Sequence, residues 1–474
     1  MRLKLIFLLS FLTGYSPIVE ANFADSVFRI SVNSKMLSAP EVLSLYIQHK
    51  SLSSHEQYAG DWLKSVCHEN GLHIYEYGNE DANYNFAASL LPLENNLPNI
   101  ILLNHIDVVD EGDSSSWIHP PFSGYISESE VWGRGAFDNK GAAIMQLFSL
   151  LEYKSKYDTI ASKYNVTFLA VSCEETMCEG GVEYVLNKYL HDLNPAVVIG
   201  EGATELSDLI EAETDDPIFG ISIVQKRPLW LHLELSIPTL GHGSVTPLEY
   251  ACKEMTIALS NLAKKKTRFI YTKENIKILK TIGNEKSGIS KFVLKHPRCF
   301  KFILSKKLRN KPEIFSLFTN TITITSINSN FRAINQIPNK VSVTLDCRLL
   351  PEYPQKKTIK FIQKVLKNDE ISIDIVATKG PTMASSIENL FYSHLESAIF
   401  ESYENVTVIP IMLPNYNDVG PFRSKGIQGF SIIPIELDIE YLKSIHSENE
   451  RIPIEALFMG AKVYLKFLEI SINK

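Results

Sequence analysis

The chain has 474 residues, of which 45% are hydrophobic and 21% are charged, and its formal net charge at pH 7 is −7. This length exceeds what one ordinary hydrophobic core accommodates, so we expect at least two domains. The acidic balance excludes the extended basic surface that nucleic-acid binding requires, and we expect no nucleic-acid partner.

The first residues have the pattern of a signal peptide. Arg2 and Lys4 make a basic start, Leu5–Leu12 is apolar, and Ala21 ends a triplet with small residues where signal peptidase cleaves. The apolar run is too short to span a bilayer easily, and no later stretch is long and apolar enough to do so. We therefore expect residues 1–21 to be removed and the mature protein to be secreted, periplasmic or extracellular, without a stable membrane span.

Strand and helix patterns alternate in the first half of the chain. Helical spacing of apolar residues extends from 40 to 71. Apolar runs then predict strands at residues 84–90, 99–103, 166–172 and 196–199, and the stretches between them predict helices at 140–157 and 181–190. Unbroken apolar strands are typical of a parallel sheet buried on both faces. The alternation predicts an α/β fold with a mostly parallel sheet flanked by helices.

The pattern changes after residue 216. A β-α-β-β-α-β-like set indicates a smaller α+β domain inserted into the first, with strands at 229–237, 341–345 and 371–376 and helices at 250–264 and 357–367. The stretch 267–320 lacks a clear period and is interpreted as an elaboration of the inserted domain. Helices at 387–403 and 454–470 complete the first domain. It thus comprises residues 22–218 and 380–474, around an insertion at 219–379.

Acidic and imidazole side chains follow the apolar runs. They are His105, Asp138, Glu174, Glu175, Glu201 and the later His446. Strand ends are where an open α/β sheet presents its ligand-binding groups, and imidazole with carboxylate suits a zinc ion. Each residue alone also fits a surface pair, an N-cap or an acidic turn. Their joint order predicts a metal centre.

Two local patterns give this centre more detail. His105 and Asp107 point to the same side of a strand, so Asp107 is placed to accept the second ring N–H of His105. Glu174 and Glu175 are adjacent carboxylates that point in different directions. One can bind a metal while the other serves as a general base, whose pKa their mutual repulsion would raise.

The six cysteines include no CxxC pair, which argues against a thiolate zinc site. Cys173 and Cys178 flank the adjacent glutamates. The sequence leaves open whether they form a disulfide or remain two buried thiols.

A series of short motifs resembles those of one dizinc metallopeptidase family, which includes aminoacylases, carboxypeptidase S, carnosinases and succinyl-diaminopimelate desuccinylase. In chain order they are HIDVV, WIHPPFSG, VWGRGAFDNKG, CEET, GEG, PTLGHGSVTP, NQIPNKVSVTLDCRLLP, NDVGPF and IHSENER. The resemblance covers nearly the whole chain after the signal peptide. The long segment before NQIP is most similar to the carboxypeptidase S and N-acyl-amino-acid hydrolase branch.

The resemblance implies two zinc ions, for which Co²⁺ or Mn²⁺ could substitute, in a zinc-exopeptidase-like catalytic domain. His105, Asp138 and Glu201 would hold one ion. Asp138, Glu175 and His446 would hold the other, so that Asp138 bridges the pair. A water shared by the two ions would attack the substrate amide as hydroxide.

The resemblance also implies catalytic and substrate-binding residues. Glu174 would be the general base, and Asp107 would orient a metal-bound histidine. His242 of the inserted lid or dimerisation domain would stabilise the oxyanion, often across a dimer. Arg348 and Asn335 would contact the substrate carboxylate and the oxyanion. Whether the chain forms a homodimer through the inserted domain stays open.

These roles predict a zinc-dependent hydrolase of small peptides, as a carboxypeptidase or dipeptidase, or of N-acyl amino acids, as an aminoacylase. The sequence does not separate these two substrate classes. The alternatives are an inactive family member that acts as a binding protein and an enzyme with a single metal at His105.

The chain departs from the family motifs in places. Asp110 replaces the usual proline, and Gly200 stands where many relatives carry an acid. The arginine that often follows Asp418 is displaced to Arg423. The expected metal ligands are all retained, so these departures bear on substrate choice.

Overall fold

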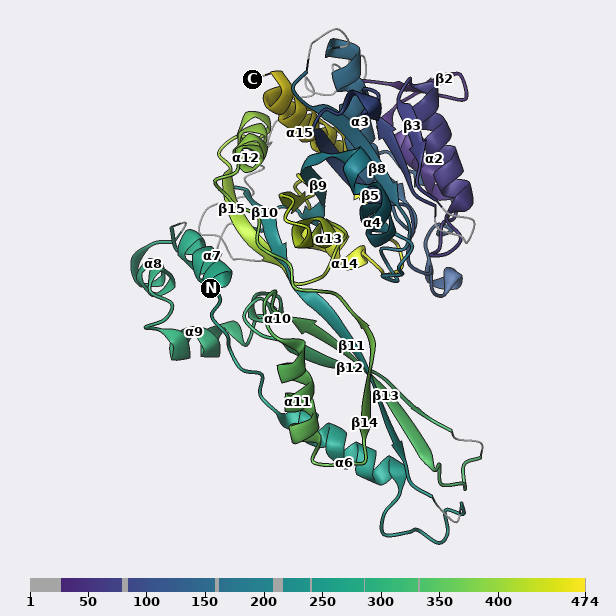
Figure 1. The fold of residues 1–474 in the computed structure, drawn as a ribbon, viewed down its shortest axis with the longest axis vertical. Coiled ribbons are helices and arrows are strands. Elements are labelled where there is room, and N and C mark those ends of the chain that lie inside the picture. The colour runs from purple at the N-terminus through teal and green to yellow at the C-terminus, as the bar shows by residue number, and fades with distance from the viewer. Residues whose placement is uncertain are drawn as a thin grey trace, which may run out of the picture.

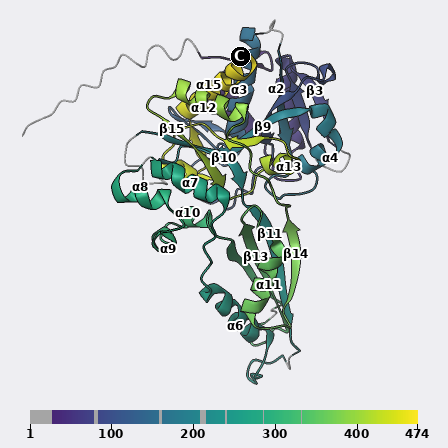
Figure 2. The same ribbon diagram turned by 60° about the vertical axis from the view of Figure 1, so that its left-hand side comes forward.

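The computed structural model describes residues 27–78, 84–157, 162–207, 216–238, 241–284, 286–330 and 333–473. The expected signal peptide, residues 1–21, lies outside them. Within the described ranges, no helix combines the length and apolar character needed to cross a membrane. Figures 1 and 2 show a larger lobe, in which helices surround a twisted sheet, and a smaller elongated lobe that extends from it.

An eight-stranded sheet runs through the larger lobe in the order β15-β10-β16-β9-β5-β8-β4-β3. The pairs β5–β8, β5–β9, β9–β16 and β10–β15 are parallel, while β10–β16, β4–β8 and β3–β4 are antiparallel. The predicted α/β fold with a mostly parallel sheet is confirmed. The strands are β3 (His73–Glu76), β4 (Phe86–Ser89), β5 (Asn99–His105), β8 (Asn165–Val171), β9 (Pro195–Ala203), β10 (Ile218–Gln225), β15 (Thr407–Leu413) and β16 (Gly429–Ile432).

Helices cover both faces of this sheet. One core contains residues of α1 (Ala39–Gln48), α2 (Gln57–Glu69), α3 (Lys140–Tyr157), α12 (Leu390–Ser402) and α15 (Ile454–Asn473). The other contains residues of α4 (Val182–Leu193) and α13 (Val419–Ser424).

Neighbouring residues of β5 pack into these two different cores, because the side chains of a strand alternate between its faces. Ile100 and Leu102 lie in the core with α3 and α15, whereas Ile101 and Leu103 lie in the core with α4 and α13. Both faces of the central strands must therefore be apolar. This is why these strands are unbroken apolar runs in the sequence.

A small sheet aligns two distant segments next to the carboxyl ends of the central strands. It consists of β6 (Tyr125–Ile126), β7 (Glu130–Trp132) and β17 (Arg451–Pro453), all antiparallel. Pairing of β7 with β17 brings the chain after α14 (Ile439–Ser444) beside the chain before α3. The remaining short elements are β1 (Ile30–Val32), β2 (Lys35–Leu37), η1 (Leu93–Asn95) and η2 (Ser114–Ser116).

The smaller lobe contains a four-stranded antiparallel sheet in the order β12-β13-β11-β14. Alternate residues of β11 and β13 are buried against the helices on one face, which leaves the other face polar and partly exposed. The elements are β11 (Arg227–Ser236), α6 (Ala251–Lys264), β12 (Thr321–Ser329), β13 (Lys340–Leu349), α11 (Gln355–Leu366) and β14 (Ser372–Thr378).

Two expectations about the insertion need correction. The insertion was expected from residue 219, but β10 belongs to the large sheet, and the second sheet begins only at Arg227. The stretch 267–320 was interpreted as part of the inserted domain. Its helix α7 (Lys273–Asn284) instead packs on β15, and Ile278 joins the core of the larger lobe. We therefore propose that the smaller lobe lies between residues 226 and 379, and that α7, although it falls within this range, packs with the larger lobe.

The reason for this packing is an open sheet edge. Strand β15 ends the large sheet, and the apolar side of α7 (Lys273–Asn284) covers it, with Ile282 packed against the buried cluster that includes Ile409 and Ile411. The other helices of this stretch are α8 (Gly288–Lys295), α9 (Lys301–Leu308) and α10 (Pro312–Ser316).

Candidate metal centre

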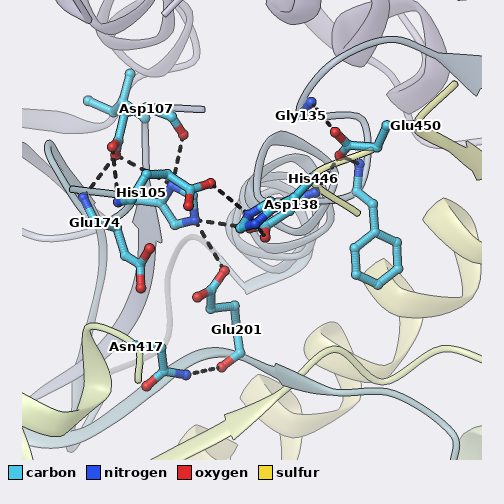
Figure 3. Close-up of polar contacts among 12 residues, drawn as sticks. His105, Asp107, Gly135, Asp138, Glu174, Glu201, Asn417, His446 and Glu450 are labelled. Carbon is cyan, nitrogen blue, oxygen red and sulfur yellow. Dashed lines mark hydrogen bonds and ion pairs between the residues drawn. The ribbon is translucent and has the colours of Figure 1, made fainter. Parts of the chain in front are cut away.

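All six residues predicted to form the metal centre come together. His105 ends β5, Glu201 lies near the end of β9, and Glu174 and Glu175 follow β8. The carboxyl ends of adjacent parallel strands meet at one edge of a sheet, so these side chains converge there. The other two residues, Asp138 and His446, come from the two segments that the small sheet aligns (Figure 3).

His105 is buried and held by contacts at both ring nitrogens. Its Nδ1 lies 2.8 Å from the main-chain oxygen of Asp107, whose carboxylate Oδ1 is farther away at 3.5 Å. The closer partner is thus the carbonyl rather than the expected carboxylate. Its Nε2 faces Asp138 Oδ1 at 3.1 Å and Glu201 Oε2 at 3.2 Å.

Asp138 lies between two histidines. Its Oδ1 is 3.1 Å from Nε2 of His105, and its Oδ2 is 3.1 Å from Nε2 of His446. The same nitrogen of His446 lies 3.2 Å from Glu175 Oε1. A carboxylate that presents one oxygen to each histidine has the arrangement needed to bridge two cations (Figure 3).

The loop after β8 is held by the carboxylate of Asp107, which is fully buried. Its Oδ1 accepts the N–H of Glu174 at 3.0 Å, and its Oδ2 accepts the N–H of Glu175 at 3.1 Å. The hydroxyl of Ser53 donates to the same Oδ2 at 2.6 Å. Asp107 therefore positions both glutamates through their main chain.

A disulfide closes the same loop. Cys173 and Cys178 are bonded, with their Cα atoms 5.4 Å apart. This resolves the alternative that the sequence left open. The bridge encloses both glutamates, so the segment between the cysteines has less freedom than an open loop.

The adjacent glutamates differ in their contacts. Ligand atoms of His105, Glu174 and Glu201 lie within 4.8 Å of one another, and so do those of His105, Asp138 and Glu175. Proximity to His105 therefore does not distinguish the two glutamates. Glu175 contacts His446, whereas the Glu174 carboxylate makes no hydrogen bond to another of the described side chains and points into the same space (Figure 3).

The electrostatics of this cluster favour bound cations. Burial and the nearby Asp138 raise the pKa of Glu201 to about 7. Burial also raises the pKa of Asp418 to about 8, with Asp107 and Glu201 adding to the effect. Divalent ions would relieve this repulsion, and a mixed imidazole and carboxylate donor set suits zinc, cobalt or manganese. The residues present thus fit a metal centre.

His242 and Asn335 lie together but away from this centre. Residues 242 and 336 form a β-bridge, and the N–H of Gly243 donates to the carbonyl of Asn335 at 2.7 Å. His242 follows the outer end of β11 and Asn335 precedes the outer end of β13, and the 10 residues of each strand span roughly 30 Å. Figure 1 shows these strands extending from the larger lobe to the far tip.

Arg348 lies at the other end of β13, near the larger lobe. It pairs in register with Pro228 and Thr321, at the inner ends of the neighbouring strands. Its Nε lies 2.9 Å from Asp346 Oδ1, which also accepts the indole N–H of Trp230 at 3.1 Å. The guanidinium is therefore held on the partly exposed face of the smaller sheet.

Sequence reasoning gave no role to several residues around the centre. Asn417 donates from Nδ2 to the main-chain oxygen of Glu201 at 2.7 Å, and Asp418 follows it. The displaced Arg423 is buried in the core, where it binds Gln225 and main-chain oxygens rather than the centre. The sequence signal that could have identified Asn417 and Asp418 was the motif NDVGPF, because these are its first two residues.

A family model described as Peptidase family M20/M25/M40 matches residues 101–470. Probable carboxypeptidase S-like 2 from Dictyostelium discoideum is 26% identical over 395 residues, covering 81% of this chain and 74% of that protein. N-fatty-acyl-amino acid synthase/hydrolase PM20D1 from Mus musculus is 23% identical over 396 residues, covering 82% and 77%.

Among solved structures, the M20 family metallo-carboxypeptidase Sso-CP2 from Sulfolobus solfataricus is similar, with a TM-score of 0.71 and 21% sequence identity. The match covers 92% of this chain and 99% of that one. At this level of identity, the similarity shows that the two proteins share a fold.

Proposed function

This chain belongs to peptidase family M20/M25/M40, and from that premise we propose that it is a secreted amide hydrolase that works with two divalent metal ions. The membership makes it a metallohydrolase of the peptidase and acyl-amino-acid type. One observation carries the two-metal proposal. The two carboxylate oxygens of Asp138 each lie 3.1 Å from Nε2 of a different histidine.

We propose that the ions are zinc, with Co²⁺ or Mn²⁺ as functional substitutes. One would be held by His105, Asp138 and Glu201, and the other by Asp138, Glu175 and His446. When bound, such ions polarise a substrate carbonyl and make water more acidic.

Glu174 is the proposed general base. Burial and the charge of Glu201 raise the pKa of Glu174 well above its usual value, so its carboxylate can both take and return a proton. One carboxylate oxygen would accept a proton from the attacking water and then donate it to the nitrogen of the leaving amine. Glu175 is the weaker candidate for this role because its carboxylate is engaged with His446.

The substrate is proposed to be a small peptide or an N-acyl amino acid. Both place a free carboxylate near the scissile amide, and the guanidinium of Arg348 suits that carboxylate. Closure of the smaller lobe over the centre would be needed to bring Arg348 to it. The named activities of the two relatives span both substrate classes.

His242 and Asn335 are proposed to act on a second copy of the chain. Their place at the tip of the smaller lobe is far from the metal centre of their own chain. A homodimer through this lobe would let them stabilise the oxyanion of the partner's reaction.

The test measures metal content and hydrolysis together on the purified mature chain. We expect about two zinc ions per chain, and cleavage of dipeptides or N-acyl amino acids that a chelator abolishes. Glu174→Gln should retain the metal but lose about 10²- to 10⁴-fold in kcat. Glu179→Gln, an exposed acid of the same loop, is the matched control.

Each contrary result has a distinct meaning. Full activity of Glu174→Gln would eliminate the proposed base. One zinc per chain would favour the single-metal alternative. Two zinc ions without cleavage of any substrate in the panel would favour the inactive binding protein.

A further inference from the structure

Two charged residues of the sequence motifs have no part in the proposed chemistry, yet they meet in the interior. Arg134 belongs to VWGRGAFDNKG and Glu450 to IHSENER. Both are buried, with 2% and 0% of their side chains exposed, and Arg134 Nη1 lies 2.7 Å from Glu450 Oε2. A buried ion pair is costly unless its remaining polar atoms are also satisfied.

The carboxylate of Glu450 is satisfied by the main chain that leads to Asp138. Its Oε2 also accepts the N–H of Gly135 at 2.9 Å. Its Oε1 accepts the N–H groups of Phe137 and Asp138, each at 2.9 Å (Figure 3). The segment from 134 to 138 is thus wrapped around one carboxylate, and Asp138 cannot shift without breaking these bonds.

The same residue is tied to the segment that carries His446. Glu450 follows His446 by four residues and directly precedes β17. Its carbonyl accepts the N–H of Gly133 at 2.9 Å, where the pairing of β7 with β17 begins. Glu450 therefore joins the two segments whose side chains, Asp138 and His446, face each other at 3.1 Å.

We propose that Glu450 is a positioning residue that sets the spacing of Asp138 and His446, and thereby builds the metal site formed with Glu175. This inference rests on the proposed metal-binding roles of those residues. The site formed with His105 and Glu201 shares Asp138 but depends less on Glu450, because its other two ligands are placed by the large sheet, whereas both Asp138 and His446 of the second site lie on segments that Glu450 joins. Loss of the Glu450 carboxylate should therefore weaken the two sites unequally.

The variant Glu450→Gln tests the proposal. Its amide has only one acceptor oxygen and cannot replace the carboxylate toward Arg134 and three main-chain N–H groups. Titration of the metal-free protein with Co²⁺, followed by absorption spectroscopy and calorimetry, should show a first equivalent that binds within about threefold of wild type. The second should bind about 10- to 100-fold more weakly, as when a residue that orients metal ligands is lost.

Two further variants accompany it. Glu448→Gln removes an exposed charge from the same segment and should titrate like wild type. Glu450→Asp keeps the charge that Arg134 needs but is one methylene shorter, so it should fold and still lose the N–H contacts at Phe137 and Asp138. It therefore provides the same test if Glu450→Gln does not fold.

Unequal weakening of the two equivalents in either variant supports the proposal. Titrations that match wild type would overturn it. Equal weakening of both sites, together with a lower Tm of the metal-free protein, would also overturn it, because Glu450 would then only stabilise the fold. A wild-type chain that binds a single equivalent would overturn the two-metal function itself, and this inference with it.

Discussion

At the scale of single residues, the geometry of this centre is set mainly by side chains that bind main-chain groups. Asp107 is predicted to orient His105, and its carboxylate lies 3.5 Å from Nδ1 of that histidine while it also accepts the N–H groups of Glu174 and Glu175. Gly200 has no room for a side chain unless Val419 moves, since a Cβ there would lie 2.5 Å from Cγ2 of Val419. Motif residues were recognisable from the sequence, but the main-chain contacts that position them were not.

Lys226 provides a prediction about stability and pH. Burial lowers its pKa from 10.5 to about 7, with the positive charge of Arg348 adding to the effect. Between these two values the unfolded chain binds a proton that the folded chain does not. The free energy of unfolding should therefore gain a contribution that grows as pH rises from about 7 toward 10 and is absent below pH 7.

Urea unfolding of wild type and Lys226→Met at several pH values checks this. The rise in the free energy of unfolding between pH 7 and pH 10 should be smaller in the variant by ~2–4 kcal/mol. Lys425→Met, which replaces an exposed lysine, serves as the matched control and should follow wild type. An identical pH dependence in Lys226→Met would show that this lysine keeps its charge in the folded protein between pH 7 and pH 10.

Among the elements, two long helices of the larger lobe were predictable, whereas several strands were not. The helix predicted at 140–157 coincides with α3, and the one at 454–470 lies within α15. Strands β10, β12, β15 and β16 were missed. β12 is rich in threonine and serine, β15 contains Pro410, and β16 has 4 residues. These strands form because neighbouring strands supply their hydrogen bonds.

The loop closed by Cys173 and Cys178 gives a prediction at this scale. Replacing both cysteines by serine opens a short loop and should lower the free energy of unfolding by about 2 kcal/mol. It should also lower kcat, because Glu174 and Glu175 lie inside the loop. Urea unfolding and substrate assays of the double variant measure the two effects.

Cys299→Ser is the control, because Cys299 is exposed and free. Treatment of wild type with a dithiol reductant should lower the free energy of unfolding and kcat as the double variant does. The difference between wild type and Cys299→Ser in these two quantities should not change on reduction. If stability and kcat of the double variant both equal those of wild type, the disulfide has no role in holding the two glutamates.

At the scale of the whole molecule, His242 lies at the tip of the smaller lobe, away from the metal centre of its own chain. His242 should be needed for activity but supplied by the partner of a dimer. His242→Ala should lose about 10²- to 10³-fold in kcat, the cost of one oxyanion donor. Glu174→Gln should be inactive for a different reason, because it lacks the base.

Mixed dimers of these two inactive variants should regain activity. In such a dimer, the His242→Ala chain keeps its own Glu174 and receives His242 from the Glu174→Gln chain, so one intact centre forms. Co-expression with two affinity tags isolates the mixed dimer for assay. Mixed dimers without activity would place His242 outside the partner's site, and a monomer in solution would exclude the arrangement.

The sequence by itself determined the fold class and the identity of the clustered residues. The central strands are unbroken apolar runs because both of their faces are buried. The imidazole and carboxylate groups at the strand ends are recognisable as candidate metal ligands from their residue types and their place after these runs. Only the tertiary structure decided that Cys173 is bonded to Cys178, that Glu450 binds the main chain leading to Asp138, and that residues 273–284 cover the large sheet. Apart from the disulfide, these features depend on contacts between residues far apart in the chain. Arg134 and Glu450, separated by 316 positions, are the clearest case, because neither residue's local sequence specifies its partner.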